Sequence, residues 1–178
     1  MASNGFMGIR VAGNRGQGIL QTVLTLGNAA VVDGKNVVSI PKRKNAYAYI
    51  NELLEEDLLI SHEEIIYPSF KAPDVCLCLS REALLEALPV LKKEGLLICD
   101  EQVCNGDSQR RDITTYKVPV SRLDRSLSNM RNFMMLGFLV GLTKIVSKHA
   151  VERSLTELVD EKEAALRAFK LGYNLGVK

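Results

Sequence analysis

The chain has 178 residues, of which 47% are hydrophobic and 25% are charged, and its formal net charge is +2. This size and composition predict a single domain over residues 1–178, and no apolar run reaches the roughly 20 residues that cross a bilayer. The low, interleaved charge and the absence of tryptophan argue against binding to nucleic acid or to an anionic membrane. The amino terminus has no secretion signal, so a cytoplasmic protein is expected.

The amino-terminal segment predicts a β-α-β unit. An apolar run at 8–12 is typical of a strand, and apolar positions then recur with helical spacing from 17 to about 32. Gly34 offers a stop for this helix. A β-branched run at 36–40 predicts the second strand, which ends at Pro41 because proline cannot donate to a central ladder.

The segment after this unit has mixed signals. Residues 41–56 combine a basic run, an alternating stretch and a glutamate-rich stretch, and no element is assigned to them. A short strand at 58–61 and a turn of helix at 62–66 that ends before Pro68 are expected next.

Strands and a helix alternate in the middle of the chain. The runs DVCLCLS and LLICD are apolar throughout, which is typical of strands in a parallel sheet covered on both faces. The fold class predicted is therefore α/β, with three α/β/α layers and a mainly parallel central sheet of about five strands. The expected elements are strands at 74–80, 96–100 and 113–118 and a helix at 81–94, with a polar loop at 101–112.

The remainder of the chain predicts a helical carboxyl-terminal tail. Its central helix, NFMMLGFLVGLTKIV, is apolar nearly all round, as in a helix buried on more than one side or shared with a partner chain. The expected helices are 121–128, 132–148, 151–159 and 161–176.

Four cysteines raise the question of a metal or iron–sulfur site. Their spacing matches neither paired zinc knuckles nor an iron–sulfur run, although cysteines at neighbouring strand ends could converge on a metal. Because two of them alternate with aliphatic residues in a strand run, we expect reduced thiols that fill the core and no metal site. These cysteines are Cys76, Cys78, Cys99 and Cys104.

The turn after the first strand, GNRGQG, is the candidate ligand site. Ligands of open parallel sheets bind beyond the carboxyl ends of the strands, and glycines with exposed helix amides favour a phosphate or carboxylate there. NAD is not expected, because Arg15 replaces a fingerprint glycine and no acidic residue follows the second strand. The basic run after that strand could instead meet the extra phosphate of NADP or of coenzyme A, or form a solvated loop. The candidate cofactor-binding residues are Gly13, Arg15, Gly16, Gln17, Gly18, Lys42 and Arg43.

Candidates for acid–base or nucleophilic catalysis are few. The two histidines, His62 and His149, stand in no recognisable triad, and there is no G-x-S-x-G elbow. Both histidines are expected at the surface, and no catalytic residue is assigned.

The order of the motifs resembles that of the gamma subunit of the 2-oxoacid:ferredoxin oxidoreductases, which include the pyruvate, 2-oxoglutarate, 2-ketoisovalerate and indolepyruvate enzymes. VAGNRGQGIL is similar to the family's strand, G-x-GGQG turn and helix, and LLISHEEIIYP and APDVCLCLS match its later strand steps. The match runs nearly end to end. In the tail it is carried by Asn129, Asn132, Leu136 and Gly137 and by Ala168, Phe169, Gly172 and Tyr173.

This resemblance implies a non-catalytic subunit of a larger enzyme. The complex would carry out coenzyme A-dependent oxidative decarboxylation of a 2-oxoacid and pass electrons to ferredoxin. The resemblance implies alpha, beta and ferredoxin-like delta partner subunits, which would hold thiamine diphosphate and iron–sulfur clusters. This chain would hold no cofactor of its own but could contact coenzyme A, and when isolated it could form a homodimer.

Two departures from the family pattern leave other functions open. Asn14 and Arg15 replace the family's paired glycines, and PKRKNAYAYINELLEE replaces its loop after the second strand. The alternatives are a binding or scaffold module of the same fold with a degenerate ligand site, and an NADP-binding reductase.

Overall fold

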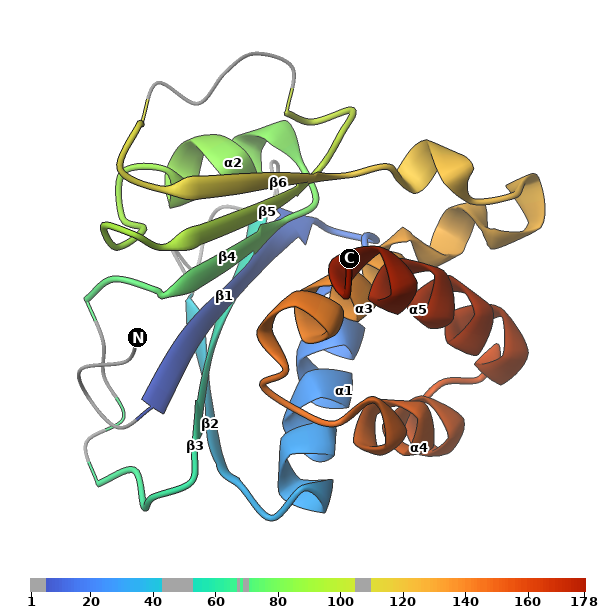
Figure 1. Cartoon of the computed structure of the whole chain (residues 1–178), viewed down its shortest axis with the longest axis horizontal. Helices are drawn as coiled ribbons and strands as arrows, with labels where there is room; N and C mark the ends of the chain where they lie inside the picture. Colours follow the sequence, from blue (N-terminus) through green and yellow to red (C-terminus); the bar gives the residue numbers. More distant parts are fainter. Residues whose placement is uncertain (1–5, 43–52, 67, 69–70, 105–109) are drawn as a thin grey trace.

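A six-stranded sheet forms the centre of the described part of the molecule (Figure 1). The computed structural model describes residues 6–42, 53–66, 68, 71–104 and 110–178. The order of strands across the sheet is β2-β3-β1-β4-β5-β6. The strands are β1 (Phe6–Asn14), β2 (Asn36–Lys42), β3 (Leu53–Ser61), β4 (Val75–Cys78), β5 (Leu96–Asp100) and β6 (Thr114–Val118).

The sheet is mainly parallel, as predicted, with one strand running the other way. β3 pairs antiparallel with both β1 and β2, whereas β1, β4, β5 and β6 pair in parallel. β1 and β2 therefore run in the same direction with β3 inserted between them, which makes the predicted β-α-β unit a split one. The sequence predicted about five strands, and it predicted β3 only over 58–61. β3 is longer because it begins within the unassigned segment 41–56, where it carries buried charged side chains.

Helices cover both faces of this sheet, which confirms the α/β fold. α1 (Ile19–Val32), α3 (Arg131–Thr143), α4 (Lys148–Leu158) and α5 (Lys162–Gly176) lie on one face, and α2 (Arg81–Ala87) lies on the other (Figure 1). α1 packs through an inward stripe of threonine, valine, leucine and alanine, and it ends where Gly34 takes φ of 72°. None of the helices in the described part of the chain has the length and apolar character needed to cross a bilayer.

Several expected helix boundaries were wrong. α2 ends at Ala87 because the following Leu88-Pro89 step disfavours helical continuation, and residues 62–66 form bends instead of a helical turn. α3 ends at Thr143, where Lys144 turns into the left-handed region. The predicted helix 121–128 is two short 3-10 helices, η1 (Val120–Arg122) and η2 (Arg125–Met130).

α3 and α5 cross with their backbones in direct contact. A Cβ atom at Gly137 of α3 would lie 2.1 Å from the carbonyl oxygen of Phe169, and one at Gly172 of α5 would lie 1.9 Å from that of Met134. Two further glycines, Gly141 and Gly176, lie one turn along and have similarly close backbone neighbours. This contact buries α3 on several sides, as its apolar sequence predicted.

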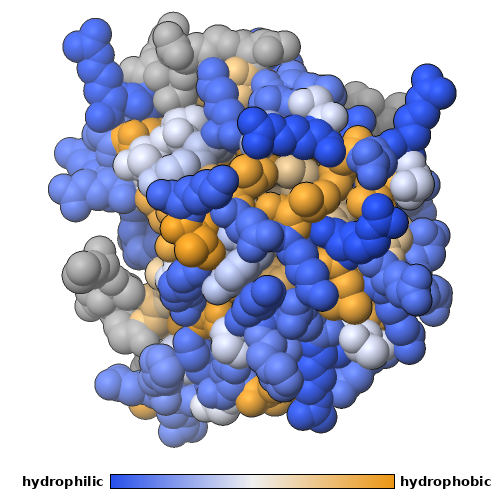
Figure 2. Space-filling model, turned by 45° about the vertical axis from the view of Figure 1, so that its right-hand side comes forward, coloured by the Kyte–Doolittle hydropathy of each residue, from blue (hydrophilic) through white to orange (hydrophobic). Residues whose placement is uncertain are grey.

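The surface of the helical layer also carries apolar side chains. Figure 2, which turns the right-hand side of Figure 1 forward, shows them gathered in the middle of that surface among charged ones. Among the described residues, the large hydrophobic side chains with the most exposure on these helices are Leu20, Leu24, Val31, Leu158 and Leu171.

Candidate functional site

The predicted glycine-rich turn links β1 to α1 at the carboxyl edge of the sheet. Gly16 and Gly18 have φ of 84° and 73°, angles that residues with a side chain rarely adopt. Gly18 is also the residue from which α1 begins, and no side chain caps that helix end. The sequence therefore predicted this strand, turn and helix correctly.

The side chain of Gln17 fills this turn. Its Oε1 atom accepts a hydrogen bond from the Asn14 amide at 2.7 Å, and its Nε2 atom donates to the Leu79 carbonyl at 3.1 Å. A Cβ atom at Gly13 would lie 2.7 Å from Gln17 Oε1, so Gly13 leaves the room that this amide occupies. Gln17 thus ties β1 to the residue that follows β4, and the Asn14 amide is already paired within the protein.

Asn132, at the start of α3, secures the other side of the turn. Its Nδ2 atom donates to the Gly18 carbonyl at 3.3 Å and to Thr22 Oγ1 at 3.2 Å. A Cβ atom at Gly18 would approach Nδ2 of Asn132 to 2.5 Å. Two motifs that lie far apart in the sequence, the glycine-rich turn and the asparagine of the tail, therefore form one structural unit.

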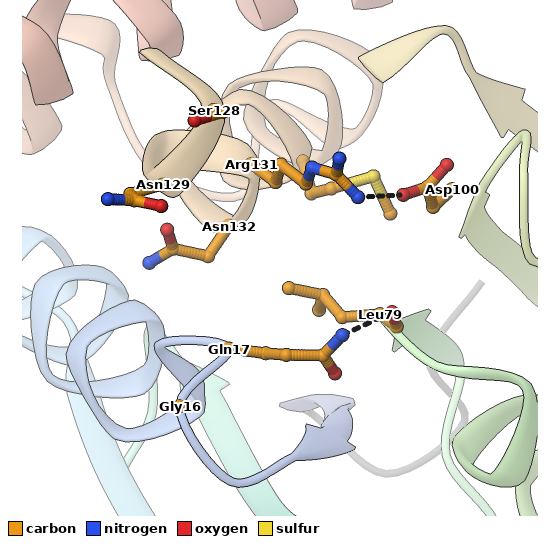
Figure 3. A pocket seen from close by; sticks show the side chains of 9 residues that line it. Gly16, Gln17, Leu79, Asp100, Ser128, Asn129, Arg131 and Asn132 are labelled. Carbon is orange, nitrogen blue, oxygen red and sulfur yellow. Dashed lines mark hydrogen bonds and ion pairs between the residues drawn. The ribbon is translucent and has the colours of Figure 1, made fainter. Parts of the chain in front are cut away.

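A cavity of about 240 Å³ opens beside this unit (Figure 3). It lies beyond the carboxyl ends of β1, β4 and β5. At this edge the chain passes from β1 to α1 on one face of the sheet and from β4 to α2 on the opposite face. Crevices at such switch points are where open α/β sheets bind ligands. In Figure 3 the side chains from α3 and η2 lie on one side of the cavity and those of Gln17 and Leu79 on the other. The lining residues are Gly16, Gln17, Leu79, Asp100, Ser128, Asn129, Arg131, Asn132 and Met135.

Asp100 and Arg131 supply the charges of the cavity. Asp100, the last residue of β5, is 5% exposed and accepts a hydrogen bond from the Gln102 amide at 2.8 Å. Burial raises the pKa of Asp100 above its ordinary value, although the Gln102 amide and the charge of Arg131 act in the opposite direction. The guanidinium of Arg131 is half exposed and lies 3.9 Å from the carboxylate, so it is placed to meet a ligand as well.

The buried carboxylate gives a testable pH dependence. Because the pKa of Asp100 is higher in the folded chain, folding takes up protons between the ordinary and the raised pKa, and stability falls as pH rises through that window. Asp100→Asn keeps an acceptor for the Gln102 amide but removes the charge. We expect it to raise the free energy of unfolding at neutral pH, with the gain shrinking towards about pH 3, where the native aspartate is protonated in both states. Urea titrations of both proteins across this range measure the difference, and a pH-independent difference would contradict the assignment.

The other predicted site residues that the structure describes do not line the cavity. Arg15 is exposed on the turn, and Arg43 lies outside the described residues. Lys42, at the end of β2, instead forms an ion pair with Asp57 of β3 at 3.2 Å. Asp57 also binds Arg10 of β1 through two hydrogen bonds of 2.7 and 3.0 Å, and both of these residues are buried.

The cysteines pack beneath α2, as expected for core residues. Burial raises the pKa of Cys76 to about 12 and also raises that of Cys78. The expectation of four free thiols was wrong for Cys99 and Cys104, which form a disulfide. The chain turns back after β5, where the Cys104 amide donates to the Asp100 carbonyl, and this places the two Cα atoms 6.3 Å apart. No group of three or more histidine, cysteine, aspartate or glutamate side chains within the described ranges is arranged to hold a metal ion.

Sequence reasoning identified Gly16 and Gln17, which line this cavity, as ligand candidates. It also placed both histidines at the surface, where His62 and His149 lie exposed. It missed Asp100, because a single acid after an apolar strand has no motif, although its place at a strand end was a usable signal. It also missed Arg131 and Ser128, whose proximity depends on the path of η2 and α3.

The chain is similar to known proteins along almost its whole length. The family model "Pyruvate ferredoxin/flavodoxin oxidoreductase" matches residues 8–175. The 2-oxoglutarate synthase subunit KorC of Methanocaldococcus jannaschii is 32% identical over 94% of this chain and 92% of its own length. The 2-oxoglutarate synthase subunit KorC of Methanothermobacter marburgensis is 30% identical over 94% of this chain and 95% of its own length.

Two solved structures share the fold. The gamma subunit of a keto/oxoacid ferredoxin oxidoreductase from Geobacter sulfurreducens has a TM-score of 0.83 at 24% identity and covers 96% of this chain and 98% of its own. The 2-oxoglutarate:ferredoxin oxidoreductase from Magnetococcus marinus, solved with 2-oxoglutarate, coenzyme A and succinyl-CoA, has a TM-score of 0.85 at 18% identity and covers 98% of this chain but 32% of its own. With a family model that spans almost the whole sequence and relatives at 30% identity or more, this chain belongs to the pyruvate ferredoxin/flavodoxin oxidoreductase family.

Proposed function

We propose that this chain is the gamma-type subunit of a 2-oxoacid:ferredoxin oxidoreductase that oxidises 2-oxoglutarate. The observation that carries the proposal is the end-to-end similarity to subunits of 2-oxoglutarate synthases, at 32% and 30% identity. The predicted resemblance to the gamma subunits agrees with the family match over residues 8–175. The reaction would couple the oxidative decarboxylation of the 2-oxoacid to the reduction of ferredoxin and yield the coenzyme A thioester.

The redox and thiamine chemistry is assigned to partner subunits, with alpha, beta and ferredoxin-like delta chains as the expected set. The donor set of this chain does not fit an iron–sulfur cluster, because two of its cysteines are bonded to each other and Cys76 and Cys78 lie buried against α2. Its cysteines are therefore not proposed as cluster ligands, and no residue of this chain is proposed to be catalytic.

The cavity at the sheet edge is proposed to contact part of coenzyme A. Its volume of about 240 Å³ is below the roughly 300–1,000 Å³ of pockets that enclose a whole ligand, so it fits one arm of a larger molecule. The carboxylate of Asp100 offers an acceptor, Arg131 offers donors, and Leu79 and Met135 add apolar surface. A buried carboxylate beside the cavity disfavours a free phosphate at its floor, so the anionic groups of coenzyme A would lie nearer Arg131 at the rim.

Reconstitution tests this function. We expect the complex assembled with this chain to reduce ferredoxin in the presence of coenzyme A faster with 2-oxoglutarate than with pyruvate or 2-ketoisovalerate. Omission of the chain should abolish that activity. Full activity without the chain, or association with no thiamine-binding subunit, would contradict the proposal, and a preference for another 2-oxoacid would overturn the substrate assignment alone.

Coenzyme A binding has its own measurement. At a concentration a hundredfold above its dissociation constant, a ligand of the folded chain adds about 2.7 kcal/mol to the free energy of unfolding. We expect coenzyme A to raise the melting temperature of the chain, and NADPH to leave it unchanged. A rise with NADPH alone would favour the reductase alternative, and no rise with either ligand would favour a scaffold.

A further inference from the structure

The outer face of α1 carries a stripe of apolar side chains. Leu20, Leu24 and Val31 are 53%, 64% and 58% exposed. At 100° per residue their positions fall within about 40° of one another around the helix, so they form a straight stripe about 16 Å long. The inward side of the same helix already packs on the sheet, so this stripe contributes nothing to the core of the chain.

α1 is also unusual in its lack of charge. Of the described helices it is the only one without a charged residue, since its sequence is ILQTVLTLGNAAVV. An exposed helix in a protein with 25% charged residues normally carries charges on its outer face. Loss of charge together with exposed leucine is typical of the centre of a protein interface.

The Magnetococcus enzyme carries the same fold as part of a longer polypeptide. There the same fold makes up 32% of a longer chain, so two-thirds of that polypeptide is joined to it covalently. In the Geobacter gamma subunit and in the KorC proteins the region similar to this chain is 98%, 92% and 95% of the whole polypeptide. A separate gamma chain must therefore hold by surface contact what the longer chain holds by peptide linkage.

We infer that the α1 stripe docks on an uncharged, apolar surface of the partner subunit that corresponds to the rest of that longer chain; this inference rests on the proposed function. A charged partner surface would lose its hydration against Leu20, Leu24 and Val31 without gaining an ion pair. A second copy of this chain fits less well, because two stripes one helix wide bury less than the roughly 800 Å² per partner of a stable interface. A larger subunit can cover the stripe and the neighbouring rim of the cavity, because α1 begins directly after Gly16 and Gln17.

Leu24→Glu tests the docking surface, with Leu85→Glu as the matched control. Leu85 is 59% exposed and lies on α2, on the opposite face of the sheet. Glutamate forms helices well, so both variants should keep the melting temperature of the unchanged chain. We expect Leu24→Glu to weaken binding to the purified partner subunits about a hundredfold, Leu24→Met to bind normally, and Leu85→Glu to bind normally.

The outcomes separate the two proposals. Normal binding by Leu24→Glu would overturn the docking surface and leave the function intact. Failure of the unchanged chain to bind any subunit of the enzyme would overturn both. If the isolated chain dimerises and Leu24→Glu makes it monomeric without affecting the complex, the stripe is a contact between copies and the assigned partner is wrong. If Leu24→Glu and Leu85→Glu weaken binding to the partner subunits equally, the docking surface would also be wrong, because the effect would then not depend on which face of the sheet carries the substitution.

Discussion

Gly172→Ala is expected to lower the free energy of unfolding by about 3 kcal/mol, at the upper end for an overpacked core. The added Cβ atom would lie 1.9 Å from the Met134 carbonyl oxygen and 2.8 Å from its carbonyl carbon. These are backbone atoms of α3 and cannot rotate away, so α3 and α5 would have to separate. The steric cost opposes the gain of about 1 kcal/mol that alanine brings to a helix interior. Urea unfolding measures the loss, and the melting temperature should fall by roughly 6–12 °C.

Gly27→Ala in α1 is the matched control for this prediction. Its Cβ atom would have its nearest neighbours at 3.8 and 3.9 Å, which is ordinary contact, so helix propensity alone should raise stability by up to about 1 kcal/mol. Opposite signs for the two variants would confirm that the contact between α3 and α5 depends on the absence of a side chain. If both variants shift the unfolding midpoint in the same direction, the close approach of the two helices is wrong.

Much of the fold could be predicted from the sequence because its strands are apolar and punctuated. β4 and β5 are continuous apolar runs, and Gly34 marks the end of α1. The spacing of apolar residues and the position of a helix-ending glycine were therefore enough to predict these elements. β3 was predicted only in part because Glu55 and Asp57 point into the protein, where charges are paired instead of solvated. A charged residue in a strand suggests a solvent-facing position unless its partner on another strand is known.

The candidate site shows a similar limit. The glycine-rich turn was visible in the sequence, but its glutamine suggested a ligand contact, whereas in the structure its amide also joins β1 to the end of β4. Lys42 belonged to a basic run that could meet a phosphate, yet it forms an ion pair with Asp57 of the neighbouring strand β3. Which partner a polar side chain meets depends on strand register, and local sequence does not determine that register.

The second large effect is expected at this buried ion pair. Asp57→Asn should lower the free energy of unfolding by about 3–5 kcal/mol, because it leaves the guanidinium of Arg10 in the interior without a charged partner of matching geometry. Asp57 is 1% exposed and Arg10 is 4% exposed, and their two hydrogen bonds measure 2.7 and 3.0 Å. Burial alone would lower the pKa of Arg10, but the hydrogen bond and charge of Asp57 raise it above its ordinary value, so the guanidinium stays charged. Chemical unfolding monitored by circular dichroism measures the loss.

Two further variants show whether burial is the cause. Arg153→Ala breaks an exposed pair of similar length, 2.8 Å to Glu157, and should change stability by less than about 1 kcal/mol, because water solvates the charge left behind. The double variant Arg10→Met with Asp57→Leu removes both charges of the pair and should recover most of the stability that Asp57→Asn loses, because the guanidinium is then no longer left in the interior without Asp57. Lys42, which also pairs with Asp57, is 38% exposed, so water can solvate its charge in this variant. If Asp57→Asn lowers the free energy of unfolding no more than Arg153→Ala does, water reaches the Arg10–Asp57 pair. The strand register that brings Arg10 and Asp57 together would then be wrong. A double variant no more stable than Asp57→Asn would instead show that the pair is needed for packing beyond its charge.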